Sequence, residues 1–163
     1  MLANPSLVIL AAGLGKRFGG NKQTASVGPQ GQWIMDYSIH DAITAGCNKV
    51  IIVVNSEVKE AVIQHFNNLF SGVDFKIVLQ ENNLLNQNFF AEDFSTTQAE
   101  IIGRRVKPWG TTHALLSAEN NINEPFCIIN ADDYYGADSM QKMFDFLKTV
   151  DRKSTRLNSS HRT

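Results

Sequence analysis

Four short apolar runs recur along the chain, and segments with helical spacing separate them. The runs are residues 7–12, 50–54, 75–79 and 126–130. A continuous apolar run of this length is typical of a strand that is buried on both faces, as in a parallel sheet. Apolar residues at helical spacing mark residues 33–45, 58–70, 111–119 and 140–150. The alternation predicts an α/β fold with a doubly wound, mostly parallel sheet and helices on both faces.

The ends of the predicted helices carry recognisable residues. Gly46 closes the first helix, and Asp36 in its first turn complements the helix dipole. The residues expected to cap the two later helices are Thr111 or Thr112, and Asp138 or Ser139.

Residues 80–107 follow neither period. Asparagine and glutamine are frequent in the first part of this segment, and several phenylalanines that lie among acidic residues follow them. A connection this long is unusual in a compact domain and is often functional. Two interpretations stay open, a functional excursion or lid and a small hairpin whose phenylalanines pack on the sheet.

Composition narrows the class of protein. The chain has 163 residues, 43% hydrophobic and 19% charged, which is ordinary for one soluble globular domain. The formal net charge of -1 argues against a nucleic-acid partner. No apolar run approaches a membrane span, and the N-terminus lacks a signal-peptide pattern, so we expect a cytoplasmic protein without a membrane partner. The sequence does not fix the oligomeric state, and a homo-oligomer stays open.

Three isolated side chains have simple interpretations. His40 has no second metal-type residue one turn away, so we expect a solvated or capping histidine rather than a ligand. Cys47 and Cys127 are expected to be reduced and to act as small packing residues, not as a disulfide.

The first apolar run ends in a loop that is rich in glycine and cations. The loop contains Gly13, Gly15, Gly19 and Gly20, with Lys16, Arg17 and Lys22 among them. Glycines allow close backbone approach, so N–H groups can converge on an anion that the cations neutralise. Phe18 and Asn21 break the dinucleotide and Walker patterns, respectively. We interpret the loop as a triphosphate site, and a Gly-rich turn with a structural role only is the alternative.

Two carboxylates directly follow the last apolar run. Asp132 and Asp133 stand just past residues 126–130, where carboxylates are costly unless they are hydrogen-bonded, solvated or bound to a cation. Magnesium commonly takes one or two protein carboxylates together with substrate phosphates. The alternative is a turn before Gly136.

In this order, the motifs resemble the nucleotidyltransferases that activate sugar phosphates. The family's Gly-x-Gly-x-Arg loop and the lysine after it match Gly13, Gly15, Arg17 and Lys22. Three further segments match in family order, GPQGQWIMDYSIHDAITAG, KPWGTTHALLSA and IINADDYYG. The resemblance runs from residue 7 to about residue 150. It implies one nucleotide-binding domain at residues 1–151, without the family's usual C-terminal half.

The resemblance also implies a reaction and a site. A nucleoside monophosphate would pass from a nucleoside triphosphate to a sugar phosphate, with Mg²⁺ as cofactor and pyrophosphate as the second product. Arg17 would hold the leaving phosphates, Lys22 would lie near the α-phosphate, and Asp132 would hold the metal, with Asp133 as the second metal candidate. The nucleotide-binding residues that it implies are Ala12, Gly13, Gly15, Lys16, Arg17, Lys22, Gln80, Gly110 and Thr111. In this set Gln80 would read a base edge, and the turn at Gly110 would lie against base and ribose.

Other functions stay open at this point. One is a nucleotide-binding module or fragment without catalysis, and another is a cytidylyl- or guanylyltransferase that acts on a non-sugar phosphate. The KPWGTTHA and NADDYYG segments favour the sugar-phosphate branch. Residues 152–163 resemble translated sequencing-adapter sequence, so we expect a non-native, disordered tail.

Overall fold

The chain alternates between strands and helices. The computed structural model describes residues 4–13, 22–67, 69–70, 72–81 and 109–149. Its strands are β1 (Ser6–Ala11), β2 (Lys49–Val54), β3 (Asp74–Leu79) and β4 (Phe126–Asn130). Its α-helices are α1 (Ile34–Thr44), α2 (Lys59–Phe66), α4 (Thr111–Ser117) and α5 (Ala137–Thr149), and the short 3-10 helices are η1 (Lys22–Thr24) and η3 (Glu119–Asn121). The expected tail at 152–163 and nearly all of the 80–107 segment lie outside the described residues.

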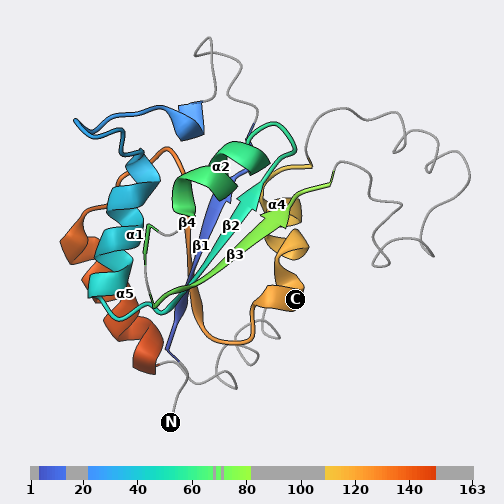
Figure 1. Cartoon of the computed structure of the whole chain (residues 1–163). Helices are drawn as coiled ribbons and strands as arrows, with labels where there is room; N and C mark the ends of the chain where they lie inside the picture. Colours follow the sequence, from blue (N-terminus) through green and yellow to red (C-terminus); the bar gives the residue numbers. More distant parts are fainter. Residues whose placement is uncertain (1–3, 14–21, 68, 71, 82–108, 150–163) are drawn as a thin grey trace, which may run out of the picture.

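The described strands form one parallel sheet in the order β3-β2-β1-β4 (Figure 1). In the register of β1, Leu7 lies opposite Val50 on one side and Cys127 on the other. The order reverses beside β1, because β2 lies on one side of it and β4 on the other. Ligands of open parallel sheets bind beyond the carboxyl ends of the strands at such a reversal. The prediction of a doubly wound α/β fold is confirmed.

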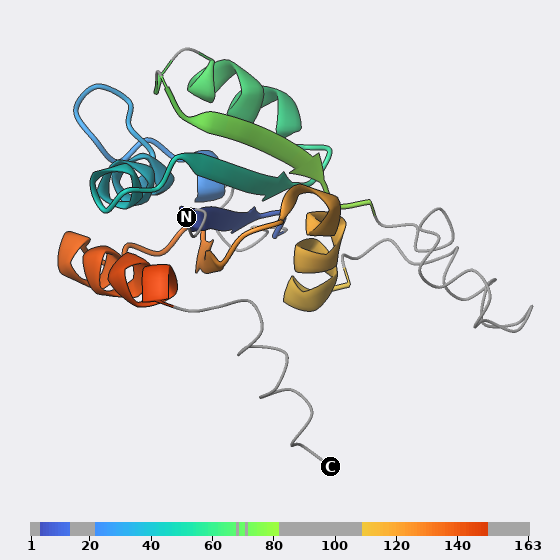
Figure 2. The same cartoon turned by 90° about the horizontal axis from the view of Figure 1, so that it is seen from below.

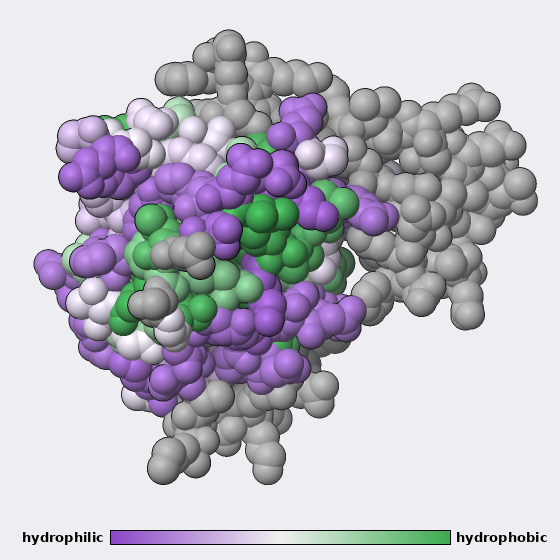
Figure 3. Space-filling model, viewed as in Figure 1, coloured by the Kyte–Doolittle hydropathy of each residue, from purple (hydrophilic) through white to green (hydrophobic). Residues whose placement is uncertain are grey.

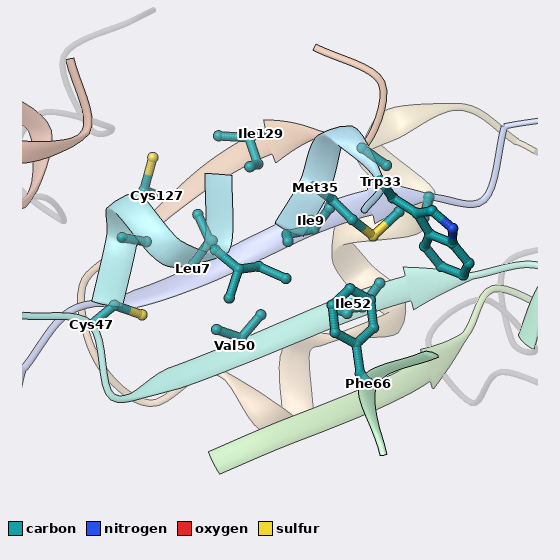
Figure 4. Close-up of a cluster of buried hydrophobic side chains, with 14 of the residues drawn as sticks. Leu7, Ile9, Trp33, Met35, Cys47, Val50, Ile52, Phe66, Cys127 and Ile129 are labelled. Carbon is teal, nitrogen blue, oxygen red and sulfur yellow. The ribbon is translucent and has the colours of Figure 1, made fainter. Parts of the chain in front are cut away.

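Helices cover both faces of the sheet (Figure 2). Helices α1, α2 and α5 pack on one face over a large apolar cluster, whose members include Leu7, Ile9 and Ile52 from the strands and Met35 and Phe66 from the helices (Figure 4). Helix α4 covers the other face over a smaller cluster, whose buried members are Val8, Ala12, Ile51, Val53, Ala114 and Ala118. Burial of each large aliphatic side chain contributes about 1.5–3 kcal/mol. Burial on both faces explains why these strands read as continuous apolar runs.

Beside β3, the outer strand of the described sheet, lies an apolar groove. It is lined by Ile63, Phe66, Asn67, Phe70, Val73, Phe75 and Ile77. The rings of Phe66 and Phe75 stack with centroids 5.7 Å apart. Figure 3 shows apolar side chains gathered on this side of the molecule among polar ones. No helix of the described ranges combines the length and the apolarity that crossing a bilayer requires.

The predicted caps of the two later helices are wrong. Gly110 precedes α4, its carbonyl accepts the first helical bond from Ala114 N at 3.1 Å, and its φ of 93° suits glycine. Thr111 is therefore already helical. At α5, Met140 N donates to Gly136 O at 3.1 Å, so Asp138 lies inside the first turn rather than before it.

Helix α2 is shorter than its apolar spacing indicated. The prediction extended it to residue 70, whereas it ends at Phe66 because Asn67 leaves the helical region with ψ of 109°. The apolar side chains beyond that point still pack, but from a non-helical segment. Phe70, for example, stacks on Phe75 with ring centroids 5.8 Å apart.

Asp36 does more than complement the helix dipole. Its Oδ2 accepts a hydrogen bond from Trp33 N at 2.8 Å, which caps α1, and lies 2.8 Å from His65 Nε2. The His65 ring stacks on Trp33 with centroids 3.7 Å apart. Together these contacts fasten the start of α1 to the last turn of α2.

The interpretations of the isolated side chains agree with the structure. Cys47 and Cys127 are buried free thiols, and burial raises the pKa of both. His40 is solvated, and its Nδ1 lies 3.6 Å from Asp41 Oδ1.

Candidate functional site

A pocket of about 330 Å³ opens beyond the carboxyl ends of β1 and β4, on the α4 side of the sheet. The residues that line it are Leu10, Ala12, Gly13, Gln23, Gln80, Gly110, Thr111, Ala114, Asn130 and Asp132. The predicted site residues that it brings together are Ala12, Gly13, Gln80, Gly110, Thr111 and Asp132. They come from four different parts of the chain, and the topology of the sheet is what collects them.

The other predicted site residues are not in this lining. Gly15, Lys16 and Arg17 lie outside the described residues. Lys22 is described only as the first residue of η1. Asp133 is described and lies next to the pocket-lining Asp132, but it does not line the pocket.

Side-chain amides hold the start of the glycine loop. Asn55 Nδ2 donates to Ala12 O at 3.2 Å, and Gln23 Nε2 donates to Gly13 O at 2.9 Å. The Asn55 Oδ1 atom in turn accepts from Val58 N at 3.1 Å, so the same side chain binds the start of α2. The backbone on the β1 side of the pocket is therefore fixed from two directions.

Gln80 is buried at the end of β3 and is only 5% exposed. Its backbone N donates to Val54 O at 2.7 Å, which extends the ladder between β2 and β3 by one residue. Its side-chain Nε2 lies 3.2 Å from Gly110 O and 2.9 Å from His113 Nδ1. The amide thus joins the end of β3 to the first turn of α4.

His113 is equally buried, with 5% exposed. Burial lowers its pKa below the usual 6.5, because the charged imidazolium is poorly solvated there. The imidazole is therefore neutral near pH 7, and its Nδ1 can accept a hydrogen bond.

The two aspartates after β4 have different surroundings. Asp133 is exposed, and its Oδ2 accepts from Asn130 Nδ2 at 2.9 Å and from Tyr135 OH at 3.4 Å. These bonds hold its carboxylate within its own turn. Asp132 is half-buried and lines the pocket. The geometry therefore makes Asp132 the better placed of the two to meet a ligand.

The donor groups fit a metal that is shared with a substrate. Mg²⁺ commonly takes one or two protein carboxylates and completes its octahedron with phosphate oxygens and water. Asp132 supplies one such carboxylate. In the part of the chain that the structure describes, no group of three or more His, Cys, Asp or Glu side chains forms a cage for a metal. Among the described residues, Asp132 is the pocket-lining carboxylate whose chemistry fits such a metal.

Sequence reasoning missed Gln23 and His113. Gln23 follows the glycine loop directly, but nothing in its type or position signals a bond to Gly13. His113 lies within the KPWGTTHA segment, three residues after Gly110, and that spacing puts it on the side of α4 that faces Gly110. The spacing is the signal that could have identified it.

Comparison with known proteins agrees with the fold and the motifs. Residues 7–132 match the model of the MobA-like NTP transferase domain. UTP–glucose-1-phosphate uridylyltransferase AglF from Haloferax volcanii is 27% identical over 133 residues, which are 80% of this chain and 44% of that protein.

Solved structures are similar in fold. A UDP-glucose pyrophosphorylase in complex with UDP-glucose aligns with a TM-score of 0.57 and 20% identity, over 91% of this chain and 54% of that one. The inositol-1-phosphate CTP transferase from T. maritima aligns with a TM-score of 0.59 and 15% identity, over 88% of this chain and 50% of that one. The chain spans about half the length of the relatives that it matches.

Proposed function

Because this chain belongs to the MobA-like NTP transferase domain family, we propose that it is the nucleotide-binding part of a sugar-phosphate nucleotidyltransferase. The proposed reaction moves a nucleoside monophosphate from a nucleoside triphosphate to a sugar phosphate and releases pyrophosphate. One observation carries the proposal: Ala12, Gly13, Gln80, Gly110 and Asp132 line a single pocket at the reversal of strand order. The names of two relatives, a glucose-1-phosphate uridylyltransferase and a UDP-glucose pyrophosphorylase, support a sugar phosphate as acceptor.

In the proposed reaction, a phosphate oxygen of the acceptor attacks the α-phosphorus in line, and the bond to the pyrophosphate oxygen breaks. Negative charge gathers on the oxygens of the α-phosphate and on the leaving group, so positioning and cations dominate the catalysis. We propose that Arg17 and Lys22 supply that positive charge from the loop after β1. Arg17 would hold the leaving phosphates through its planar guanidinium, and Lys22 would act as a point charge.

The remaining residues would position the nucleotide. The backbone at Ala12 and Gly13 is fixed by Asn55 and Gln23, so the loop begins at a defined place. Gln80 and the turn at Gly110 would hold the base. Asp132 would hold Mg²⁺, which when bound neutralises phosphate charge and orients the phosphate oxygens.

A second candidate is a cytidylyltransferase whose acceptor is a polyol phosphate rather than a sugar phosphate. The fold similarity to an inositol-1-phosphate CTP transferase favours it. The two candidates share the nucleotide pocket and differ in the acceptor and the base, so the acceptor is the variable to test.

The test is the exchange of labelled pyrophosphate into nucleoside triphosphate. UTP and CTP are each incubated with Mg²⁺ and either glucose 1-phosphate or inositol 1-phosphate, and reactions without acceptor or without Mg²⁺ are the controls. We expect label in the triphosphate only when Mg²⁺ and a sugar phosphate are both present. Exchange with inositol 1-phosphate alone would support the second candidate. Triphosphate binding without any exchange would reduce the chain to a binding module.

A further inference from the structure

Among the residues that the structure describes, Gly110 and His113 are the hydrogen-bonding neighbours of the Gln80 amide, and they determine its orientation. Gly110 O, 3.2 Å from the amide nitrogen, is a backbone carbonyl and can only accept a hydrogen bond. If the amide were flipped, its own oxygen would face that carbonyl oxygen, and the two would repel. The NH₂ group therefore faces Gly110.

The second hydrogen of the same NH₂ group points to His113. The distance between Gln80 Nε2 and His113 Nδ1 is 2.9 Å, and because the glutamine nitrogen is the donor, Nδ1 must be the acceptor. The imidazole is then the neutral tautomer with its proton on Nε2. The lowered pKa of His113, caused by burial, favours the same neutral form. A protonated Nδ1 would repel the NH₂ group and free the amide to turn.

This arrangement uses both N–H groups of the amide and leaves its oxygen for the pocket. Gln80 lines the pocket, and within the described ranges no group donates to its Oε1. A ligand beside Gln80 therefore meets an acceptor and not a donor. An amide that was free to turn could present either group and could not distinguish a donor from a lone pair on the ligand.

We propose that His113 is a positioning residue, which fixes the Gln80 amide with Oε1 toward the pocket and so makes the site select a base that offers an N–H there. This inference rests on the proposed function, since it takes the ligand to be a nucleotide. A base with a lone pair at that position leaves two acceptors facing each other, and such mismatches in a site built for hydrogen bonding are costly. The proposal places position 3 of a pyrimidine opposite Oε1, where uracil carries N3–H and cytosine carries a lone pair, so it predicts a preference for UTP over CTP.

The functional test measures the affinities of UTP and CTP by calorimetry for the wild type and two variants. His113→Leu removes the acceptor, and we expect the preference for UTP over CTP to fall on the order of tenfold, the effect of about one hydrogen bond. His113→Asn places an amide oxygen near the position of Nδ1, and we expect it to keep the preference within about threefold. His40→Leu, at an exposed histidine on α1, is the matched control and should change nothing. Thermal melting of each variant checks the fold.

A second measurement needs no nucleotide. Nitrogen NMR of the ligand-free protein at pH 7.5 reports the tautomer of His113, and a scalar coupling between His113 Nδ1 and Gln80 Nε2 reports their hydrogen bond. We expect the Nε2–H tautomer and a measurable coupling.

A cationic ring or the Nδ1–H tautomer would overturn the inference, as would a wild type that prefers CTP or a His113→Leu variant that keeps the full preference. If no triphosphate binds the wild type, the proposed function fails while the NMR result still decides how His113 orients the amide.

Discussion

The two faces of the sheet bury apolar clusters of different extent, and the smaller cluster lies beneath α4. The face beneath α1, α2 and α5 buries large side chains such as Leu7 and Phe144, both fully buried. On the face beneath α4, the end near the pocket is packed by Ala12 and Ala114. Small side chains at the strand ends leave volume, and the pocket of about 330 Å³ lies there. One face of the sheet therefore mainly stabilises the fold, whereas the other is less completely packed near the strand ends and leaves room for a binding site.

Both faces bury polar side chains, and on the face beneath α1 and α2 the buried Asp36 lies within hydrogen-bonding distance of His65. The α4 side buries Gln80 and His113, which bind each other. Buried polar groups need partners, and a bonded network holds its members in one arrangement. Substitutions on the two faces should therefore separate stability from ligand binding.

The largest expected effect is on the heavily packed face. Phe144→Ala on α5 removes a fully buried ring from the large cluster and should lower the free energy of unfolding by about 3–5 kcal/mol. Phe146→Ala on the same helix is the control, because that side chain is 63% exposed and should change stability by less than about 0.5 kcal/mol. Urea denaturation measures both. Equal losses in the two variants would show that α5 does not use Phe144 to hold the sheet.

On the pocket side, the largest expected effect concerns the metal. Asp132→Asn should lower pyrophosphate exchange about 100-fold, the lower end of the effect of removing one preorganised electrostatic group from an active site. It should also abolish most of the Mg²⁺ enhancement of triphosphate binding while it keeps or improves binding without metal, since the repulsion between carboxylate and phosphate is gone. The melting temperature should stay near that of the wild type.

Asp133→Asn is the matched control for this prediction, because its carboxylate is bonded within its own turn to Asn130 and Tyr135. We expect a small effect on the Mg²⁺ response. If Asp133 carries the metal response and Asp132 is silent, the assignment of this strand end is off by one residue. If neither variant responds, the two aspartates form only a turn.

An intermediate effect is expected at Gly110, where strain and binding can be separated. Gly110 has φ of 93° and Gly72 has φ of 82°, and a Cβ on either would meet nothing within 4 Å. Alanine at either position should therefore cost about 1–3 kcal/mol of stability from backbone strain alone. Only Gly110→Ala should also weaken triphosphate binding, because Gly110 lines the pocket and its carbonyl holds Gln80. Equal binding by both variants would remove Gly110 from the site.

The sequence predicted the fold more fully than the site. Strands such as β1 were identified because burial on both faces makes them continuously apolar. This signal is local, so it can be recognised without knowing which strands pair with one another. The caps were wrong because threonines and aspartate near a helix start suggest caps, whereas glycine carbonyls at Gly110 and Gly136 accept the first helical bonds. Positive φ at those glycines is a property of the folded backbone.

Sequence motifs identified pocket-lining residues where a single stretch carries the motif, as at Ala12, Gly13 and Asp132. The contacts that fix it are long-range, and no local pattern reports them. Gln80 and His113 are 33 residues apart in sequence, and a segment without a clear period separates them. The prediction that Gln80 reads a base therefore lacked the orientation of its amide, which depends on His113.

The smallest expected effect is the pH dependence of stability that His113 contributes. Burial lowers the pKa of His113 in the folded state below the usual 6.5, so the folded chain binds fewer protons than the unfolded chain between those two pKa values. The free energy of unfolding then rises with pH across that window. The contribution is fully present above about pH 6.5 and is lost as the pH falls from there toward the folded pKa.

The measurement compares urea denaturation of the wild type and His113→Asn from pH 5 to pH 8. Asparagine does not titrate, so the difference between the two free energies of unfolding isolates His113 from His40 and His65, which both proteins share. We expect a constant difference above pH 7. Below about pH 6.5 the wild type should lose stability relative to His113→Asn, because the imidazole binds a proton more readily in the unfolded chain than in its buried position in the folded chain. A difference independent of pH would mean that His113 titrates alike in both states. The Gln80 amide would then need another explanation for its fixed orientation.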